Sequence, residues 1–262
     1  MFLINLLSHF EIEKEQFAII TLKQDELESF LEKLPPHFRK CYITDEDLVK
    51  SVNELESHYS DLLSQYYLPD PGNVMSGEFG EILSYFILQE YYLPLLLNGP
   101  RKWLWKDDRN QAVQKTDVML FGKDEQPSKK DLLVSAEIKA KATKSKSYDP
   151  VYNAVEGAYD DYVRRLGVSL NWLKAKYAKA RSRSDIEDLE RFLDPVTHGE
   201  YTKHFKAIIV IDTELIETEL TREREIKEIS ADFEIIFISI NSLKSAYEST
   251  YKKILVSGGD IF

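Results

Sequence analysis

The stretch SAEIKAKATKSK, residues 135–146, places one acidic residue, Glu137, in an apolar run that continues into a series of lysines. If this run is a β-strand, its side chains alternate between two faces, and Lys139 lies on the same face as Glu137. An acid beside a base is common on a solvated edge strand, and the tripeptide ExK alone indicates no more than that. The same pair is also typical of a metal site that hydrolyses phosphodiesters, so other segments must distinguish the two interpretations.

A predicted hairpin brings a second acid to this strand. The loop-like stretch GKDEQPSKKD, residues 122–131, separates two expected strands. A register symmetric about Pro127 sets Asp117 opposite Glu137, where two like charges destabilise a sheet. A cation between the carboxylates removes this repulsion, and Mg²⁺ takes one or two carboxylates while keeping waters for substrate oxygens. The spacing therefore favours a metal site over a solvated pair.

A helix expected over residues 74–92 adds a third acidic position. Glu78 and Glu81 lie three residues apart in GEFGEILSYFILQ, so they point within about 60° of each other. The apolar run begins directly after Glu81, which places this side chain at the buried rim. The helix dipole favours acids near a helix N-terminus, and this accounts for Glu78. Gly77 and Gly80 are expected to allow close approach of the backbone.

The composition is that of a soluble globular α/β protein. The chain has 262 residues, 43% hydrophobic and 30% charged, enough for one large domain or a domain with an added lobe. No apolar run approaches the roughly 20 residues of a membrane helix, so we expect no membrane association. Residues 1–15 lack the basic start and the cleavage site of a signal peptide. Cys41 is the single cysteine, which excludes an internal disulfide and a thiolate metal cluster and favours a cytoplasmic location.

The net charge of −11 is unevenly distributed. Residues 129–183 contain 13 Lys and Arg against 6 Asp and Glu, a local charge of +7, whereas the remainder carries −18. Because local fields decide where a polyanion binds, the acidic total does not exclude DNA. The acidic remainder would repel DNA from most of the surface or face a protein partner.

The order of expected elements indicates one α/β core with a helical N-terminal part. Strands are expected over residues 17–22, 101–105, 111–122, 130–140, 205–213 and 233–240. Helices are expected over residues 24–34 (ended by Pro35 and Pro36), 44–67, 74–92, 148–179, 184–193 and 221–230.

The helix glutamate, Asp117 and Glu137-Ile138-Lys139 together resemble the PD-(D/E)XK nuclease superfamily, over roughly residues 77–212. Thr116 stands where that pattern has its proline. GEFGE, KTDVMLF and AEIKAKAT are similar to HamA, the small nuclease subunit of the Hachiman antiphage defence system. The resemblance implies a restriction-endonuclease-like core with a mixed central sheet flanked by helices, over residues 73–262. Residues 1–72 would be an N-terminal elaboration of strand and helices.

The resemblance also implies an activity and a partner. The expected activity is that of a Mg²⁺-dependent deoxyribonuclease with little sequence specificity, in which Mn²⁺ substitutes for Mg²⁺. The expected partner, besides DNA, is a superfamily 2-type helicase subunit, HamB, which uses ATP and restrains the nuclease. DNA damage or invading DNA would then release the nuclease from this restraint.

Within this resemblance the acidic residues receive metal-binding roles. Asp117 and Glu137, with the carbonyl of Ile138, are expected to hold one Mg²⁺ against a phosphate oxygen. Glu81, with Glu78 as the alternative, is expected to take a second metal position or to orient the attacking water.

The basic residues receive catalytic and DNA-binding roles. Lys139 is expected to position the attacking hydroxide and to offset developing negative charge. Neighbouring cations are expected to lower its pKa, so that it can also accept a proton. Phosphate contacts without sequence reading are expected from Lys141, Lys144, Lys146, Arg164 and Arg165. The basic residues between 174 and 183 either extend this track or are ordinary solvated side chains.

Two alternative functions remain open. A non-catalytic module of the same fold would bind DNA or protein, although such modules usually lose one of the three residues that this chain retains. An autonomous restriction-type endonuclease would need a sequence-reading domain, and no segment indicates one. The five histidines lack the spacing of a zinc site, and no GxxxxGK[ST] motif indicates an ATPase.

Overall fold

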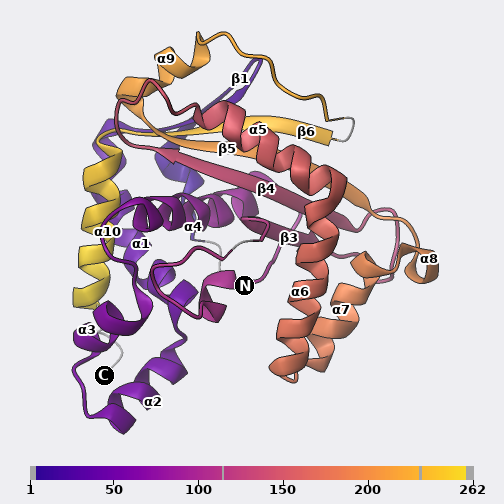
Figure 1. The fold of residues 1–262 in the computed structure, drawn as a ribbon, viewed down its shortest axis with the longest axis horizontal. Coiled ribbons are helices and arrows are strands. Elements are labelled where there is room, and N and C mark those ends of the chain that lie inside the picture. The colour runs from indigo at the N-terminus through magenta and orange to yellow at the C-terminus, as the bar shows by residue number, and fades with distance from the viewer. Residues whose placement is uncertain (1–3, 114, 230–231, 258–262) are drawn as a thin grey trace.

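The computed structural model describes residues 4–113, 115–229 and 232–257. Within these ranges, six strands form one mixed sheet with helices on both faces (Figure 1). The strands are β1 (Phe10–Lys14), β2 (Ala18–Leu22), β3 (Val118–Gly122), β4 (Leu132–Lys141), β5 (Thr202–Asp212) and β6 (Asp232–Ile240). The longer helices are α1 (Leu27–Tyr42), α2 (Asp45–Leu55), α4 (Asn73–Tyr91), α5 (Pro150–Asp160), α6 (Leu166–Lys179), α7 (Arg183–Leu193) and α10 (Leu243–Ser257). The short helices are α3 (Tyr59–Leu62), α8 (Pro195–His198) and α9 (Ile216–Leu220).

The strand order is β1-β2-β6-β5-β4-β3. The four inner strands are parallel, and β1 and β3 pair antiparallel at the two edges. Ile208 and Val210 of β5 pack into one core, whereas Ala207 and Ile209 pack into another on the opposite face. A parallel strand covered on both faces has no polar face, which is why the central part of β5, residues 207–211, is continuously apolar. The prediction of an α/β fold with a mixed sheet flanked by helices is confirmed.

Two helical layers cover the sheet. Helices α1, α4 and α10 lie on one face, and α5 lies on the other, continuing into α6 and α7 (Figure 1). A Cβ added to Gly80 of α4 would lie 3.4 Å from side-chain atoms of Ile138 and Val210, so α4 packs closely on the sheet there. Apart from its chain neighbours and the backbone of its own helix, no atom lies within 4 Å of a Cβ added to Gly77. The expected close approach is therefore found at Gly80 and not at Gly77.

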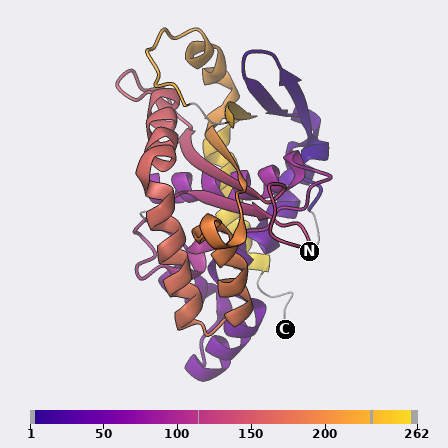
Figure 2. The same ribbon diagram turned by 90° about the vertical axis from the view of Figure 1, so that its right-hand side faces the viewer.

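Residues 4–72 contribute to the sheet as well as to the helical layer. The β1–β2 hairpin continues the sheet because β2 pairs parallel with β6, with Ala18 beside Ile236. Figure 2 shows this hairpin on the side of the molecule opposite α5 and α6. Helix α1 packs against α10, and its Phe38 contacts Phe79 and Phe86 of α4. The division of the chain at residue 72 stays a prediction.

Helix α1 continues through the two prolines that were expected to end it. It extends to Tyr42, although each proline removes a backbone donor. Phe30, Leu34 and Phe38 lie on both sides of this break and are completely buried. Their packing against α4 and α10 offsets the lost hydrogen bonds, an effect that local sequence rules do not include.

Three other predicted elements are wrong in type or extent. Residues 101–105 were expected as a strand but contain a 3₁₀ turn over Lys102–Trp105, because the neighbouring Lys102 and Trp103 are both buried and strand alternation is lost. The helix expected over 44–67 is broken after Leu55, where Glu56 adopts a left-handed conformation. The charged stretch expected as a helix over 221–230 is irregular in its described part, residues 221–229. Its arginines instead pair with Glu219 and Asp149.

Two further differences concern the start of a strand and one additional helix. The strand expected over residues 111–122 begins only at Val118, with residue 114 outside the described ranges. Helix α10 was not predicted. No helix in the described ranges combines the length and apolar character needed to cross a membrane.

Candidate active site at the start of strand β3

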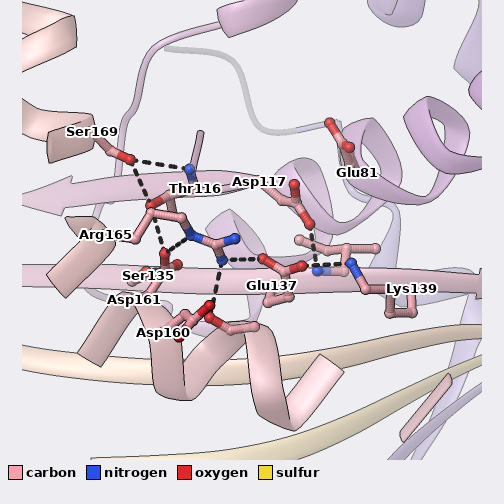
Figure 3. Close-up of polar contacts among 12 residues, drawn as sticks. Glu81, Thr116, Asp117, Ser135, Glu137, Lys139, Asp160, Asp161, Arg165 and Ser169 are labelled. Carbon is pink, nitrogen blue, oxygen red and sulfur yellow. Dashed lines mark hydrogen bonds and ion pairs between the residues drawn. The ribbon is translucent and has the colours of Figure 1, made fainter. Parts of the chain in front are cut away.

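The β3–β4 hairpin has the predicted register. Val118 pairs with Ala136, so the next position along the hairpin sets Asp117 opposite Glu137. The backbone N–H of Ile138 donates to Oδ2 of Asp117 at 2.8 Å, which fixes this carboxylate at the point where β3 begins (Figure 3). The two acids that the sequence suggested therefore lie next to each other.

Glu137 is a buried carboxylate held by two cations. Lys139 pairs with its Oε1 and Arg165 pairs with its Oε2 (Figure 3). Lys139 lies on the same face of β4, as predicted. Burial raises the pKa of Glu137 to about 7, and the charge of Asp117 adds to this rise, whereas Lys139 and Arg165 oppose it. The expected repulsion between the two acids is thus present.

The predicted lowering of the Lys139 pKa is wrong. Burial acts to lower this pKa, but the carboxylates of Glu137 and Asp117 raise it above its ordinary value. The charged groups that act most strongly on Lys139 are these acids, not the lysines that follow it in the sequence. These acids therefore favour the charged form of Lys139.

Glu81 reaches the site from the opposite face of the sheet. It lies on α4, and its Oε2 accepts hydrogen bonds from Trp103 Nε1 at 3.0 Å and from Lys102 Nζ at 3.1 Å. Burial raises the pKa of Glu81 to about 7, with contributions from the charges of Asp117 and Glu78 against that of Lys102. Lys102 also lies 3.4 Å from Asp117 Oδ1. Burial lowers the pKa of Lys102, but Glu81 and Asp117 raise it above its ordinary value.

Glu78 points away from this group of acids into the protein. Its side chain is 2% exposed, pairs with Lys106 and accepts a hydrogen bond from the hydroxyl of Tyr42 at 2.8 Å. The first turn of α4 contains no acid, so the interpretation of Glu78 as a helix-terminus residue is wrong. Of the two helix glutamates, the structure brings Glu81 to Asp117.

A cleft of about 1150 Å³ opens beside these residues. Asp117, Lys139 and Glu81 line it, whereas Glu137 and Glu78 do not. Its other polar lining comes from Asn73, Ser76, Lys115, Lys141, Thr143, Ser145, Tyr148, Arg165, Lys244, Tyr247 and Glu248. The cleft is thus large, open and lined by both acids and bases, and Glu137 lies just behind its wall.

Two of the predicted phosphate-binding residues have other partners. Nζ of Lys141 donates to Glu219 at 2.7 Å and to the carbonyls of Ser145 and Tyr148 at 3.1 and 3.0 Å, and the residue is buried. It therefore shapes the loop of residues 142–149 and is not free to bind DNA. Arg165 forms ion pairs with Glu137 and Asp161.

The other predicted phosphate-binding residues are accessible. Lys144 and Lys146 are exposed on the 142–149 loop, which also contributes residues to the cleft wall. The side chain of Arg164 is 75% exposed and lies 3.5 Å from Asp160. These three side chains have the exposure that binding to a phosphate requires.

A buried polar network supports the two acids from behind. Asp161 accepts hydrogen bonds from Ser135 Oγ at 2.8 Å and Thr116 Oγ1 at 3.0 Å, and it pairs with Arg165 (Figure 3). Ser169 Oγ accepts the N–H of Thr116 at 3.1 Å. Asp161 and Arg165 lie in a π-helical turn, Asp161–Arg165, a feature often found at functional sites. Their four-residue spacing was the available sequence signal, because it places both on one helix face.

The carboxylates at this site fit one divalent cation. No group of three or more His, Cys, Asp or Glu is arranged to hold a metal in the described ranges. Mg²⁺ needs only one or two carboxylates with waters, and Asp117, Glu137 and the carbonyl of Ile138 match that donor set. Burial is the main cause of the raised pKa of Glu137, and a cation would also offset the repulsion from Asp117 that adds to it. In this structure both oxygens of Glu137 already pair with cations, Oε1 with Lys139 and Oε2 with Arg165.

Comparison with known proteins gives one family. Among curated proteins no match is found. The family model for HamA matches residues 3–254, a range that includes α4, the β3–β4 hairpin and α5. The resemblance of the three short segments thus extends over nearly the whole sequence, and the chain belongs to the HamA family.

Proposed function

We propose that this protein is a metal-dependent DNA nuclease that hydrolyses phosphodiester bonds with little sequence specificity. The observation that carries this proposal is the position of Asp117 opposite Glu137, with Lys139 on the same face, at the wall of a large cleft. Membership of the HamA family fits a role in antiphage defence. The order α4, β3–β4 hairpin, α5, β5 supports assignment of the core to the PD-(D/E)XK superfamily.

In the proposed mechanism, Asp117 and Glu137 would hold the cation with the carbonyl of Ile138. Bound Mg²⁺ or Mn²⁺ would supply Lewis acidity and lower the pKa of the attacking water. Lys139 lines the cleft and remains protonated, so it places a positive charge where negative charge develops on the phosphate. Lys139 therefore acts as a hydrogen-bond donor and an electrostatic stabiliser.

DNA binding is assigned to the exposed basic residues beside the cleft. Lys144, Lys146 and Arg164 would contact phosphates, which gives affinity without sequence reading. We further propose that a helicase subunit of the HamB type restrains the nuclease within a defence complex in the cytoplasm. The strongly acidic remainder of the chain supports a protein partner rather than further DNA contacts.

The test is cleavage of plasmid DNA by the purified chain with Mg²⁺ or Mn²⁺, at low salt and without a partner. Cleavage is expected with either metal and should stop with EDTA. Glu137→Ala combined with Lys139→Ala should abolish it. A matched control removes an acid–lysine pair from the surface: Lys129→Ala with Glu200→Ala, whose side chains are 82% and 76% exposed.

Each alternative function gives a different result in this assay. DNA that is bound but stays intact with both metals would indicate a non-catalytic module. Discrete fragments cut at one sequence would indicate a restriction-type endonuclease. Wild-type cleavage by the folded double variant would exclude the proposed site.

A further inference from the structure

Lys102 is a buried cation between two acids of the candidate site. Its side chain is 4% exposed, and its Nζ lies 3.1 Å from Glu81 Oε2 and 3.4 Å from Asp117 Oδ1. The same amine donates to the carbonyl of Thr116 at 3.4 Å. Lys102 therefore joins α4, which covers one face of the sheet, to the start of the edge strand β3.

The neighbouring residue fixes the same carboxylate. Trp103 Nε1 donates to Glu81 Oε2 at 3.0 Å, so this oxygen accepts from two consecutive residues of the 3₁₀ turn. Trp103 is buried and packs edge-on against Tyr85 of α4. The turn thus directs a lysine and an indole at the same oxygen of Glu81. These two contacts hold the carboxylate in place without a metal ion.

We propose that Lys102 takes the place of a second divalent cation, so that the site binds one ion, at Asp117 and Glu137. This inference rests on the proposed function. Glu81 is then a positioning residue, which holds Lys102 against Asp117, and it is no metal ligand. This assignment replaces the second metal position that the sequence suggested for Glu81.

The charge balance of the site supports a single ion. Four carboxylates, Glu81, Asp117, Glu137 and Asp161, face three cations, Lys102, Lys139 and Arg165, which leaves one net negative charge. One divalent ion adds the positive charge that a phosphate in the transition state neutralises. A second divalent ion beside Glu81 would lie next to the ammonium of Lys102 in a poorly screened environment, where like charges repel strongly.

The test is the number of Mn²⁺ ions bound by the full chain, measured by calorimetry and by electron paramagnetic resonance without DNA. The wild type is expected to bind one ion. Lys102→Met removes the positive charge between Glu81 and Asp117, so a second ion should bind. Lys102→Arg keeps the charge, so this variant should bind one ion like the wild type. Lys106→Met is the matched control, because it removes the equally buried lysine that pairs with Glu78 away from the cleft. It should lower the thermal stability and leave one ion bound.

The outcomes separate this inference from the proposed function. Two ions in the wild type, or one ion in a folded Lys102→Met, would overturn the role of Lys102 and leave the nuclease proposal intact. No ion in the wild type would overturn the metal dependence and this inference together. If Lys102→Met does not fold, Lys102→Gln replaces it, and the wild-type stoichiometry decides on its own whether a second ion is present.

Discussion

Gly157 lies directly against the carboxylate of Glu137: a Cβ added to this glycine would be 2.4 Å from Cδ of Glu137 and 2.6 Å from its Oε1. Helix α5 therefore crosses β4 with no side chain between its backbone and the acid. Lys139 and Arg165 hold the two oxygens of Glu137, so the carboxylate cannot move without breaking an ion pair. The absence of a side chain at Gly157 is what leaves room for a buried acid here.

Gly157→Ala is accordingly expected to impair cleavage more than folding. The added methyl group displaces Glu137, and misplacement of a site group by about 1 Å can cost on the order of 10²-fold in rate. Alanine is better than glycine within a helix by about 1 kcal/mol, which offsets the strained contact in the free energy of unfolding. Plasmid cleavage and urea unfolding measure the two effects.

The control for this variant is Gly167→Ala in α6, where no atom lies within 4 Å of the added Cβ. It should gain up to about 1 kcal/mol of stability and keep full cleavage. Normal cleavage by a folded Gly157→Ala would show that the position of the Glu137 carboxylate does not matter for the reaction.

Glu78→Gln and Glu81→Gln should have opposite effects. Glu78→Gln leaves the buried ammonium of Lys106 without its partner, and loss of one member of a buried ion pair costs about 3 kcal/mol or more. Its cleavage, measured well below the unfolding temperature, should persist because Glu78 does not line the cleft. Glu81→Gln should reduce cleavage strongly, with a smaller change in the free energy of unfolding. An inactive but stable Glu78→Gln would reverse these assignments.

Glu137→Gln should flatten the pH dependence of stability. The pKa of Glu137 rises from 4.5 to about 7 in the folded state, so the folded protein binds this proton more strongly than the unfolded chain. The contribution of Glu137 to stability therefore falls as pH rises through this window. Urea unfolding of metal-free protein at about pH 5, 6 and 7 should give a steeper decline for the wild type. Parallel pH profiles would contradict the raised pKa.

Lys144→Ala with Lys146→Ala should weaken DNA binding uniformly across sequences. If each lysine neutralises one phosphate, the slope of log K against log salt should decrease by roughly 0.9 for each lysine replaced. Binding is measured in a Glu137→Ala background to prevent cleavage. Lys50→Ala with Lys252→Ala, two exposed lysines outside the cleft, should leave the slope unchanged. Equal slopes for both pairs would exclude the 142–149 loop from the DNA interface.

Cys41 should be inert to thiol reagents in the folded protein. Its side chain is completely buried in α1, and burial raises its pKa to about 12, so the reactive thiolate is absent near neutral pH. Native protein should resist modification, and denatured protein should react fully. The labelling rate then reports opening of the α1 layer, with Cys41→Ser as the blank. Rapid labelling of native protein would mean that this layer opens readily.

The β3–β4 hairpin could be predicted because its determinants are local. A short loop centred on Pro127 and two apolar strands fix the register that sets Asp117 opposite Glu137. The face shared by Glu137 and Lys139 follows from strand geometry alone. The α/β class could also be predicted from the sequence, since β5 and β6 contain long apolar runs between helical segments.

The partners of these acids could not be predicted, because they depend on tertiary packing. Arg165 was expected to contact DNA, but a π-helical turn between α5 and α6 directs it to Glu137. Lys102 was placed in a strand, whereas the packing of Trp103 on α4 forms a 3₁₀ turn that buries it. Lys141 pairs with Glu219, far along the chain. The charge pattern of the sequence shows which cations are present but not which acids they pair with in the folded protein.

The pairing of β2 with β6 has a consequence for synthesis of the protein. Ala18 meets Ile236 in the finished sheet, so the first strands leave the ribosome long before their neighbour is made. Strand β4, which carries Glu137 and Lys139, likewise waits for β5. A nascent chain thus holds the proposed cutting residues without the framework that aligns them. If the protein cuts DNA as proposed, cleavage would begin only after β5 and β6 have been made.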